Sequence, residues 1–479
     1  MNERIGDWWR RHHLVVTGLA FLGVATFLVL MIALRLWALA PDYDWGSAGL
    51  LDSVRLLRGM PVYEDWQTGH PTWMYGPGNI WLFAGVFAVT GPSLGVAVAF
   101  SLFATAASIA LCSAILKPRL SGWWLAAAVL SFVLIEDKVM VFSSLRPDAI
   151  AFLFGLAGLC LCYRGGVART VLGGMLIVAA TLTKQTMLAS AAVPLFALAL
   201  EMRRPTAREV LLAAVPLAMV AIAFLAMKSD PLVWYYFVEL SAQYSSQINY
   251  RDFVFLAVGH FIAALPLWIA AIFLLWRKIE LVPDWKHLLR WTLAASLVSA
   301  LVGALAAAKF GGGINSLMPA WFALVLLCWV TMIPVLDAAR DWDRGWIVQS
   351  GLLLAMLLFM LPRTAEVSWP LDHLRDGTRQ SYLELRQRVR ALPDTVMSPG
   401  DVMLTFQQRG QLDRSVYLDL DVLKWPASLP EDLLDSRYSA IHIVVDDLKQ
   451  IDYLRLRERG YVQTWTSGRY SIWSRTAAQ

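Results

Sequence analysis

The sequence predicts an all-α polytopic membrane domain of about 11 transmembrane helices, followed by a small α/β domain outside the cytoplasm. Three observations predict this fold class. Of the 479 residues, 58% are hydrophobic and only 16% are charged, whereas about 25% of residues are charged in soluble domains. Apolar runs of roughly 17–25 residues recur, and each is long enough to cross a hydrocarbon core of about 30 Å. After residue 361 these long runs give way to short apolar segments.

The first apolar run, residues 14–40, is predicted to be a retained transmembrane helix. It is longer than a signal-peptide core and has no clear small-residue cleavage site. Arg4, Arg10 and Arg11 precede it, so the N-terminus is predicted to be cytoplasmic.

Residues 45–90 are predicted to form the first extracytoplasmic loop, with juxtamembrane helices. The stretch "SAGLLDSVRLL" has amphipathic helical spacing. The stretch "MYGPGNIWLFAGVFAVTG" is apolar but short, and Gly and Pro interrupt it, which indicates a juxtamembrane or re-entrant segment.

Further apolar runs complete the predicted membrane domain, which covers residues 1–362. They are residues 92–116, 122–140, 148–163, 169–186, 188–201, 209–227, 253–276, 290–308, 316–336 and 345–361. If each of these runs crosses the membrane once, the basic loop residues lie on the cytoplasmic side, as the positive-inside rule requires. They are Lys117, Arg119, Arg164, Arg169, Arg203, Arg204, Arg208, Arg277, Lys278, Lys286, Arg290, Arg340 and Arg344. Counting the "YGPG" stretch as a full span would reverse this agreement for Lys117 and Arg119.

Residues 363–479 are predicted to form the α/β domain. Tyr382, Leu385, Val389 and Leu392 recur at helical spacing. The segments "DVMLT", "SVYLDL" and "AIHIVVDD" are interpreted as short buried strands, and "YVQTWTSGRYSIWSR" as a hairpin that turns at Ser467-Gly468. An odd number of spans puts this domain in the periplasm or extracellular space.

The remaining composition excludes several classes of protein. The four cysteines all lie in apolar runs, so neither a disulfide framework nor a cysteine metal cluster is predicted. The net charge of +5 arises in the membrane portion, where it sets topology, and no nucleic-acid partner is predicted.

Polar residues from distant segments are predicted to collect on the outer face. Charged groups at membrane depth cost roughly 2.5–3.5 kcal/mol each, yet several stand at the ends of spans. The set comprises Asp42, Asp44, Arg55, Arg58, His70, Tyr75, Arg146, Asp148, Lys184, Lys309 and Asn315. Lys and Arg suit a phosphate, and a carboxylate suits removal of a proton from a hydroxyl. The set therefore predicts a cavity at the outer boundary that binds an anionic head group and performs acid–base chemistry.

Several members of this set also have an ordinary structural interpretation. Asp42, Asp44 and Asp148 are each suited to cap a helix. Lys184 and Lys309 are each suited to extend toward the lipid headgroups. The hypothesis of a site therefore depends on the whole set of residues.

Four ordered stretches resemble the GT-C superfamily of membrane glycosyltransferases, in the branch that contains the protein O-mannosyltransferases and the lipid A aminoarabinose transferase. They are Asp44 with Gly59 and "YGPG", "LRPDAIAFLFGLAGLC", "LTKQTMLASAAVP" and "KFGGGINSLMP". The similarity runs through about three quarters of the chain, in the membrane domain. This sequence departs from the pattern by lacking the second proline after "YGP", by offering His70 where the aminoarabinose enzyme has a lysine, and by "GGGINS" in place of a tyrosine-containing segment.

The resemblance implies transfer of a sugar from a polyprenyl-phosphate donor to an acceptor hydroxyl on the extracytoplasmic face, with inversion, in cell-envelope glycosylation. It implies that Asp44 and Asp148 are catalytic, with Asp44 as the base. The implied ligands of the donor phosphate are Lys184, Lys309, Arg55, Arg58 and Arg146, and the implied substrate contacts are Asp42, His70, Tyr75 and Asn315. The expected acceptor is a glycan, a lipid or a protein, and the expected location is a bacterial inner membrane. No cofactor is predicted; some GT-C enzymes need a divalent metal ion.

Two other functions compete with the transferase. A flippase or transporter of lipid-linked sugars would need charges near the membrane midplane and repeated halves, and the sequence predicts neither. A non-catalytic scaffold that binds cell-wall polymer would tolerate the loss of both carboxylates. Replacement of Asp44 separates these hypotheses, because only a transferase loses turnover while it still binds the lipid.

Overall fold

The computed structural model describes residues 43–475, except residues 121, 136–144, 202, 246–247, 310–311 and 361–376, together with residue 12 and runs of two or three residues between 15 and 34. The side chains of residues 43–45 and 245 also lie outside the described part. The predicted boundary between the domains at residues 362–363 therefore falls outside the described part, and the predicted first span is described only in part.

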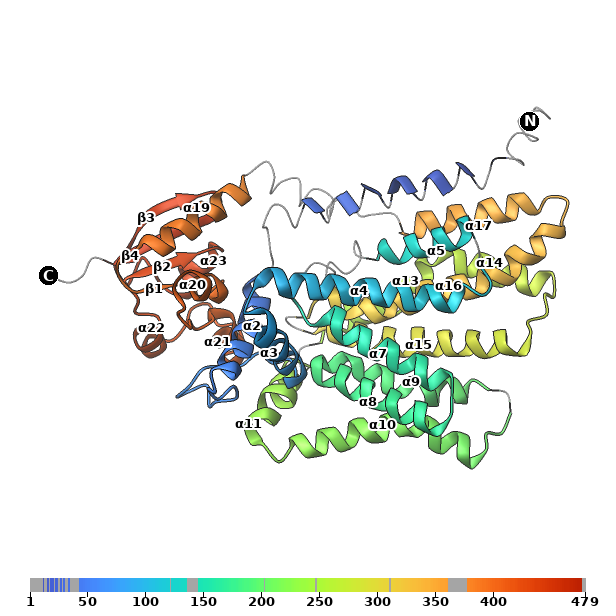
Figure 1. Ribbon diagram of the computed structural model, residues 1–479, viewed down its shortest axis with the longest axis horizontal. Helices are drawn as coiled ribbons and strands as arrows, with labels where there is room; N and C mark the ends of the chain where they lie inside the picture. Colours follow the sequence, from blue (N-terminus) through green and yellow to red (C-terminus); the bar gives the residue numbers. More distant parts are fainter. Residues whose placement is uncertain are drawn as a thin grey trace.

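A bundle of apolar helices forms the larger part of the molecule, and most of its helices run along the long axis (Figure 1). The bundle helices are α4 (Leu94–Leu116), α5 (Trp123–Val133), α7 (Asp148–Tyr163), α8 (Val167–Thr183), α9 (Leu188–Ala199), α10 (Ala207–Met227), α13 (Tyr250–Ala263), α14 (Leu265–Trp276), α15 (Pro283–Ala308), α16 (Met318–Ala338) and α17 (Gly345–Met360). Most bounds agree closely with the predicted apolar runs, but α15 begins seven residues before the predicted run 290–308, and the predicted run 253–276 is two helices, α13 and α14. A bundle of this composition is a multi-pass membrane domain.

Only some of these helices are individually long enough to cross a bilayer. Within the described residues, four helical stretches are long and apolar enough: Leu94–Leu116, Ala207–Met227, Pro283–Ala308 and Ile314–Asp341. Helices α13 and α14 form a fifth candidate span that is bent by 56°. The bend lies at Ala264, just before Pro266, which has no N–H to continue the helical hydrogen bonds. The other apolar helices are shorter, so the predicted count of about 11 spans is not confirmed.

The first loop folds into two helices that lie between the bundle and the C-terminal unit (Figure 1). They are α2 (Tyr43–Leu57) and α3 (Pro77–Thr90), and they pack against each other. Pro77 stands at the first position of α3, where its missing N–H costs nothing. Helix α3 also packs against α8, which brings the "YGPG" stretch to the end of that helix.

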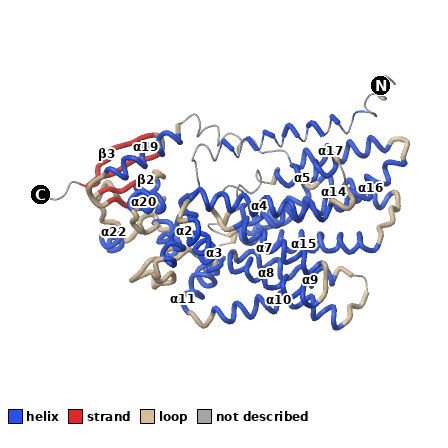
Figure 2. Tube along the Cα trace, in the orientation of Figure 1, coloured by secondary structure: helices blue, strands red, loops and turns tan. Residues whose placement is uncertain are grey.

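The C-terminal unit is an α/β structure, as predicted (Figure 2). Its elements are α19 (Thr378–Ala391), β1 (Val396–Met397), α20 (Val402–Arg409), α21 (Val416–Val422), α22 (Glu431–Arg437), β2 (His442–Val445), α23 (Lys449–Tyr453), β3 (Tyr461–Ser467) and β4 (Tyr470–Arg475). The strands form one sheet in the order β1-β2-β4-β3, with β1 parallel to β2 and the other pairs antiparallel. The hairpin turns at Gly468, whose φ of +56° suits glycine.

Two segments predicted to be strands are helices. "DVMLT" belongs to α20, because the Asp401 carboxylate caps that helix by accepting from the Leu404 N–H at 3.2 Å. "SVYLDL" belongs to α21, whose residues are all buried. A fully buried short segment has no alternation of polar and apolar residues to distinguish a strand from a helix.

The C-terminal unit is docked on the first loop. Arg414 donates to the carbonyls of Gly69 and Trp66, and Arg437 donates to that of Gln67. Val402, Met403 and Leu418 join the hydrophobic core of the bundle. Helices α20 and α21 therefore form the side of the C-terminal unit that packs against the rest of the molecule.

Candidate functional site

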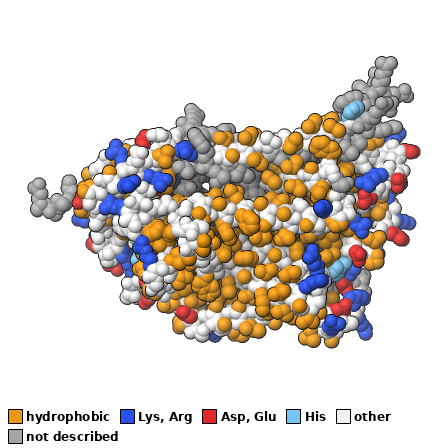
Figure 3. All heavy atoms as spheres, viewed as in Figure 1, with side chains coloured by type: hydrophobic (Ala, Val, Ile, Leu, Met, Phe, Trp, Pro, Cys, Tyr) orange, Lys and Arg blue, Asp and Glu red, His pale blue; other side chains and the backbone are white. Residues whose placement is uncertain are grey.

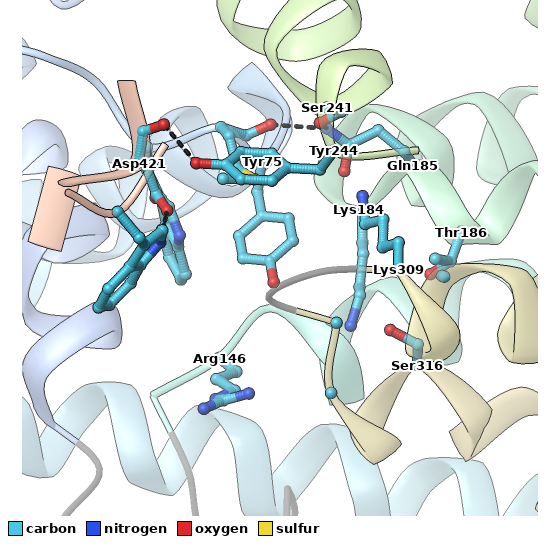
Figure 4. A pocket seen from close by; sticks show the side chains of 16 residues that line it. Tyr75, Arg146, Lys184, Gln185, Thr186, Ser241, Tyr244, Lys309, Ser316 and Asp421 are labelled. Atoms are coloured by element: carbon cyan, nitrogen blue, oxygen red, sulfur yellow. Dashed lines mark hydrogen bonds between the residues drawn. The ribbon is translucent and has the colours of Figure 1, made fainter. Parts of the chain in front are cut away.

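A cavity of about 240 Å³ lies where the bundle, the first loop and the C-terminal unit meet. Its lining comes from segments that are far apart in the sequence. The lining residues are Trp73, Met74, Tyr75, Arg146, Lys184, Gln185, Thr186, Ser241, Tyr244, Ala306, Lys309, Gly312, Gly313, Ser316, Asp421 and Trp425. Four residues predicted from sequence, Tyr75, Arg146, Lys184 and Lys309, are thus brought to one cavity (Figure 4).

A buried ion pair forms one side of this cavity. Lys184, the residue directly after α8, pairs with Asp148, the first residue of α7, and both are about 1% exposed. The Asn315 amide, in the 3₁₀ helix η3 (Ile314–Leu317), donates to the same Asp148 oxygen at 3.0 Å. The start of a helix favours a carboxylate because its N–H groups carry partial positive charge. This cluster ties α7, α8 and η3 together, and it leaves the other Asp148 oxygen without a hydrogen-bond partner among the described residues.

Close backbone contacts at two glycines bring Tyr75 to Lys184. A Cβ on Gly76 would overlap the carbonyl oxygen of Leu182, and a Cβ on Gly78 would lie 2.9 Å from the Leu182 carbonyl carbon. The Tyr75 ring consequently lies 5.6 Å from the Lys184 ammonium, a cation–π distance. Figure 4 shows the Tyr75 hydroxyl directed into the space between Arg146 and the lysines.

The lining carries more positive than negative charge. Lys184 is compensated by Asp148, whereas the Lys309 ammonium has neither an ion pair nor a hydrogen bond within the described part of the chain. Arg146 lies beside Gly313, with its Nη1 3.6 Å from the position of a Cβ on that glycine. The acidic lining residue is Asp421, and burial raises the pKa of its carboxyl well above the usual range. Such a lining favours an anion, and phosphate in particular.

The first turn of α2 is positioned next to the segment that carries Arg146. A Cβ on Gly46 would overlap the Leu145 side chain, so α2 starts against residues 145–148. Asp44 belongs to this turn, but its side chain lies outside the described residues, as does all of Asp42. The catalytic assignment of Asp44 therefore stays a prediction.

The two arginines of the first loop lie elsewhere. Arg55 is 2% exposed and pairs with Glu64 at 3.0 Å and with Asp52 at 3.4 Å. Arg58 donates to the Gly410 carbonyl at 3.4 Å and stacks over the Phe406 ring. Arg55 thus braces the first loop and Arg58 holds the C-terminal unit, so neither is retained as a phosphate ligand.

His70 also lies outside the cavity lining. Burial, with the charges of Arg55 and Arg414, lowers the pKa of His70 to about 4, so the ring is neutral at pH 7. Asn315 does not line the cavity either, but its side-chain amide hydrogen-bonds Asp148.

Several lining residues were missed in the sequence, above all Asp421 and Trp425 from the C-terminal unit. The segment just before them, "SVYLDL", was interpreted as a short buried strand, and neither residue was singled out, although Asp421 is only 3% exposed. Gln185 was also missed. Its amide donates to the carbonyls of Met74 and Phe237 at 2.6 and 3.0 Å. The polar Tyr- and Gln-rich loop before residue 250 was the available signal for Ser241 and Tyr244.

A metal site has no support from the described residues, which contain no group of three or more His, Cys, Asp or Glu side chains that could hold a metal ion. The cations of the lining supply the positive charge of this cavity.

Comparisons with known proteins identify the fold. No protein-family model matches the chain, and no curated protein sequence matches it either. The structure is similar to that of ArnT from Cupriavidus metallidurans bound to undecaprenyl phosphate, with a TM-score of 0.53 and 15% identity over 95% of this chain and 98% of that one. The apo state of the same ArnT gives a TM-score of 0.52 and 14% identity over 94% and 98% of the two chains. The oligosaccharyltransferase AglB from Archaeoglobus fulgidus gives a TM-score of 0.46 and 11% identity over 98% and 74% of the two chains, a similarity too low to support a conclusion.

Proposed function

We propose that this chain, which has the fold of a GT-C membrane glycosyltransferase, transfers a sugar from a polyprenyl-phosphate donor to an acceptor hydroxyl. The observation that carries the proposal is the single cavity lined by Arg146, Lys184 and Lys309. ArnT, which shares the fold along nearly its whole length, was crystallised with undecaprenyl phosphate. An anionic lipid headgroup is the ligand that best fits a cationic cavity beside an apolar bundle.

In the proposed reaction the acceptor hydroxyl attacks the anomeric carbon of the donor sugar. The new carbon–oxygen bond forms as the bond from that carbon to the phosphate oxygen breaks, and polyprenyl phosphate leaves with its electron pair. Attack from the face opposite the phosphate inverts the configuration. Arg146 and Lys309 stabilise the charge of the leaving phosphate.

Asp44 is proposed to accept the hydroxyl proton. The position of the α2 start against Leu145 supports this role. Asp148 is proposed to position Lys184 rather than to contact the reacting atoms, because its carboxylate is engaged by Lys184 and Asn315. Tyr75 is retained as a substrate contact, because it lines the cavity.

The cavity is proposed to open to the extracytoplasmic side of the cytoplasmic membrane of a bacterium, with the N-terminus in the cytoplasm. Loops such as those between α9 and α10 and between α14 and α15 lie at the end of the bundle away from the C-terminal unit (Figure 1), and they carry the basic residues expected inside.

The test is single-turnover transfer in proteoliposomes. The probes are undecaprenyl phosphates that carry one radiolabelled sugar, and the acceptors are the envelope glycans and lipids of a strain that lacks the protein. The wild type should transfer label and release undecaprenyl phosphate, and Asp44→Asn should bind lipid without turnover. Lipid movement across the bilayer by Asp44→Asn at the wild-type rate, without label transfer by either protein, would instead indicate a flippase.

A further inference from the structure

The C-terminal unit contributes a buried carboxyl group to the cavity. Asp421, in α21, is 3% exposed and lines the cavity. One carboxyl oxygen accepts from the Trp425 indole N–H at 3.2 Å. The other, Oδ2, is buried without a hydrogen-bond partner among the described residues. An unsatisfied buried acceptor costs about 1–3 kcal/mol, so this oxygen indicates a missing ligand.

Trp425 is held at the cavity by a strained backbone. Lys424 and Trp425 have φ angles of +59° and +54°, and two consecutive non-glycine residues in the left-handed region are uncommon. Each such residue costs on the order of 1–3 kcal/mol, and strain of this kind clusters at ligand sites. The backbone N–H of Trp425 donates to the Leu420 carbonyl at 2.7 Å, and this hydrogen bond holds the turn between the two residues.

Packing within the C-terminal unit fixes the indole as well. The Trp425 ring lies 6.2 Å from the ring of Tyr417 and 6.2 Å from that of Tyr453, distances typical of aromatic pairs. The Tyr244 hydroxyl, from helix α12 (Leu240–Ser245), donates to the Asp421 carbonyl, as Figure 4 shows. Asp421 and Trp425 therefore form a fixed pair on the wall that the C-terminal unit supplies.

We infer that Asp421 and Trp425 bind the sugar ring of the lipid-linked donor, an inference that rests on the proposed function. The side chain of Asp421 hydrogen-bonds a hydroxyl or amino group of the sugar, and the indole of Trp425 packs against the apolar face of the ring. A carboxyl and a fixed aromatic ring supply the two kinds of contact that a sugar ring requires, because one edge of the ring is polar and its faces are partly apolar.

The size of the cavity favours the donor sugar over a polymeric acceptor. Its volume of about 240 Å³ lies below the roughly 300–1,000 Å³ of typical small-molecule sites. The same cavity also holds Arg146 and Lys309, which are proposed to bind the phosphate. A phosphate with one attached sugar ring would place the phosphate at Arg146 and Lys309 and the ring at Asp421.

The raised pKa of Asp421 fits this role. Burial raises the pKa of the Asp421 carboxyl. The hydrogen bond from Trp425 and the charge of Lys309 lower this pKa, but burial has the larger effect. A raised pKa favours the neutral acid, which both donates and accepts hydrogen bonds.

The experiment compares two kinds of lipid on the full chain in nanodiscs. The probes are undecaprenyl phosphate alone and undecaprenyl phosphates that carry glucose, galactose, mannose or a 4-amino pentose, and the readout is Kd. The wild type should bind one sugar-bearing lipid more tightly than the bare lipid. Asp421→Ala and Trp425→Leu should each lose about tenfold for that lipid and stay within about twofold of wild type for the bare lipid, whereas Trp425→Phe should keep most of the affinity.

Asp413→Asn is the matched control, because Asp413 is a buried carboxyl of the same unit outside the cavity lining, and it should bind every lipid as the wild type does. Three outcomes would overturn the inference while leaving the proposed function intact: unchanged affinity of the Asp421 and Trp425 variants for sugar-bearing lipid, an equal loss for both kinds of lipid, or no preference of the wild type for any sugar. A wild type that binds none of these lipids would overturn the proposed function itself.

Discussion

At the scale of single residues, the cavity depends on a buried charge pair. Asp148 and Lys184 are both almost fully buried and lie directly against each other. Removal of one partner of such a pair leaves a charge that neither water nor protein compensates, which typically costs about 3–5 kcal/mol. The pair therefore positions Lys184 and maintains the fold at the same time.

Asp148→Ala should consequently destabilise the protein more than the double variant Asp148→Ala/Lys184→Met. The single change leaves the Lys184 ammonium buried without its counter-charge, and the double change removes both charges. Thermal unfolding of the purified chain in one detergent measures the difference. A double variant no more stable than Asp148→Ala would contradict the assigned pairing.

A second residue, Asp401, should give the C-terminal unit a pH-dependent stability. Burial, and next the charge of Asp446, raises the pKa of Asp401 to about 7 from an ordinary value of 3.8. At a pH between 3.8 and about 7, Asp401 keeps its proton in the folded chain but has lost it in the unfolded chain. The contribution of Asp401 to stability should therefore fall as pH rises from about 4 to about 7, by at most about 1.4 kcal/mol per pH unit.

The measurement compares the wild type with Asp401→Asn, which keeps an amide able to cap α20. The Tm of the wild type minus that of the variant should decrease across this pH range and stay level above it. A difference that grows with pH would show that Asp401 is ionised in the folded chain.

At the scale of elements, glycines bring the "YGPG" stretch against the end of α8. Gly76 leaves no room for a side chain beside the Leu182 carbonyl. This contact allows Tyr75 to reach Lys184, so it couples the first loop to the cavity.

Gly76→Ala should reduce both transfer and stability, the latter by about 1–3 kcal/mol, because the added methyl group meets backbone that cannot move aside. Gly85→Ala, inside the helix α3 that Gly76 precedes, is the matched control, since a Cβ there meets no atom within 4 Å and alanine favours a helix by about 0.5–1 kcal/mol. Equal effects of the two substitutions on Tm and on transfer would refute the close contact.

Helix bounds were the most predictable feature of the sequence, since a long apolar run has one stable form in lipid. The short buried segments of the C-terminal unit were less predictable, and α20 and α21 were predicted as strands. The helix α21 continues past the predicted strand to include Asp421, and a helix directs its side chains differently from a strand. Lys184 and Lys309 were singled out from the sequence because a cation at the end of an apolar run costs free energy in a membrane, and both line the cavity. The sequence does not reveal that Arg55 pairs with Glu64, so its place outside the cavity lining could not be predicted.

At the scale of the whole molecule, the surface changes from hydrophobic to charged along the bundle. In Figure 3 hydrophobic side chains cover the middle of the visible face, and charged side chains gather at the end away from the C-terminal unit. Several large apolar residues of α10, such as Leu211 and Leu225, are about 70% exposed. An apolar belt between polar ends is the surface expected of a chain embedded in a bilayer.

The two ends of the bundle should therefore face opposite sides of the membrane. In a chain whose four native cysteines are replaced by alanine, Arg204→Cys should react with a membrane-impermeant maleimide only after the cells are opened. Lys449→Cys should react in intact spheroplasts, because the C-terminal unit is proposed to lie outside. Labelling of both positions from one side would refute the proposed topology.

The most direct test of the account is a structure of the full chain in nanodiscs that contain undecaprenyl phosphate. The account predicts phosphate density in the cavity beneath the C-terminal unit, within hydrogen-bonding distance of Lys309 and Arg146, and a prenyl tail that runs along the bundle. Phosphate bound outside this cavity, with Lys309 uninvolved, would contradict it.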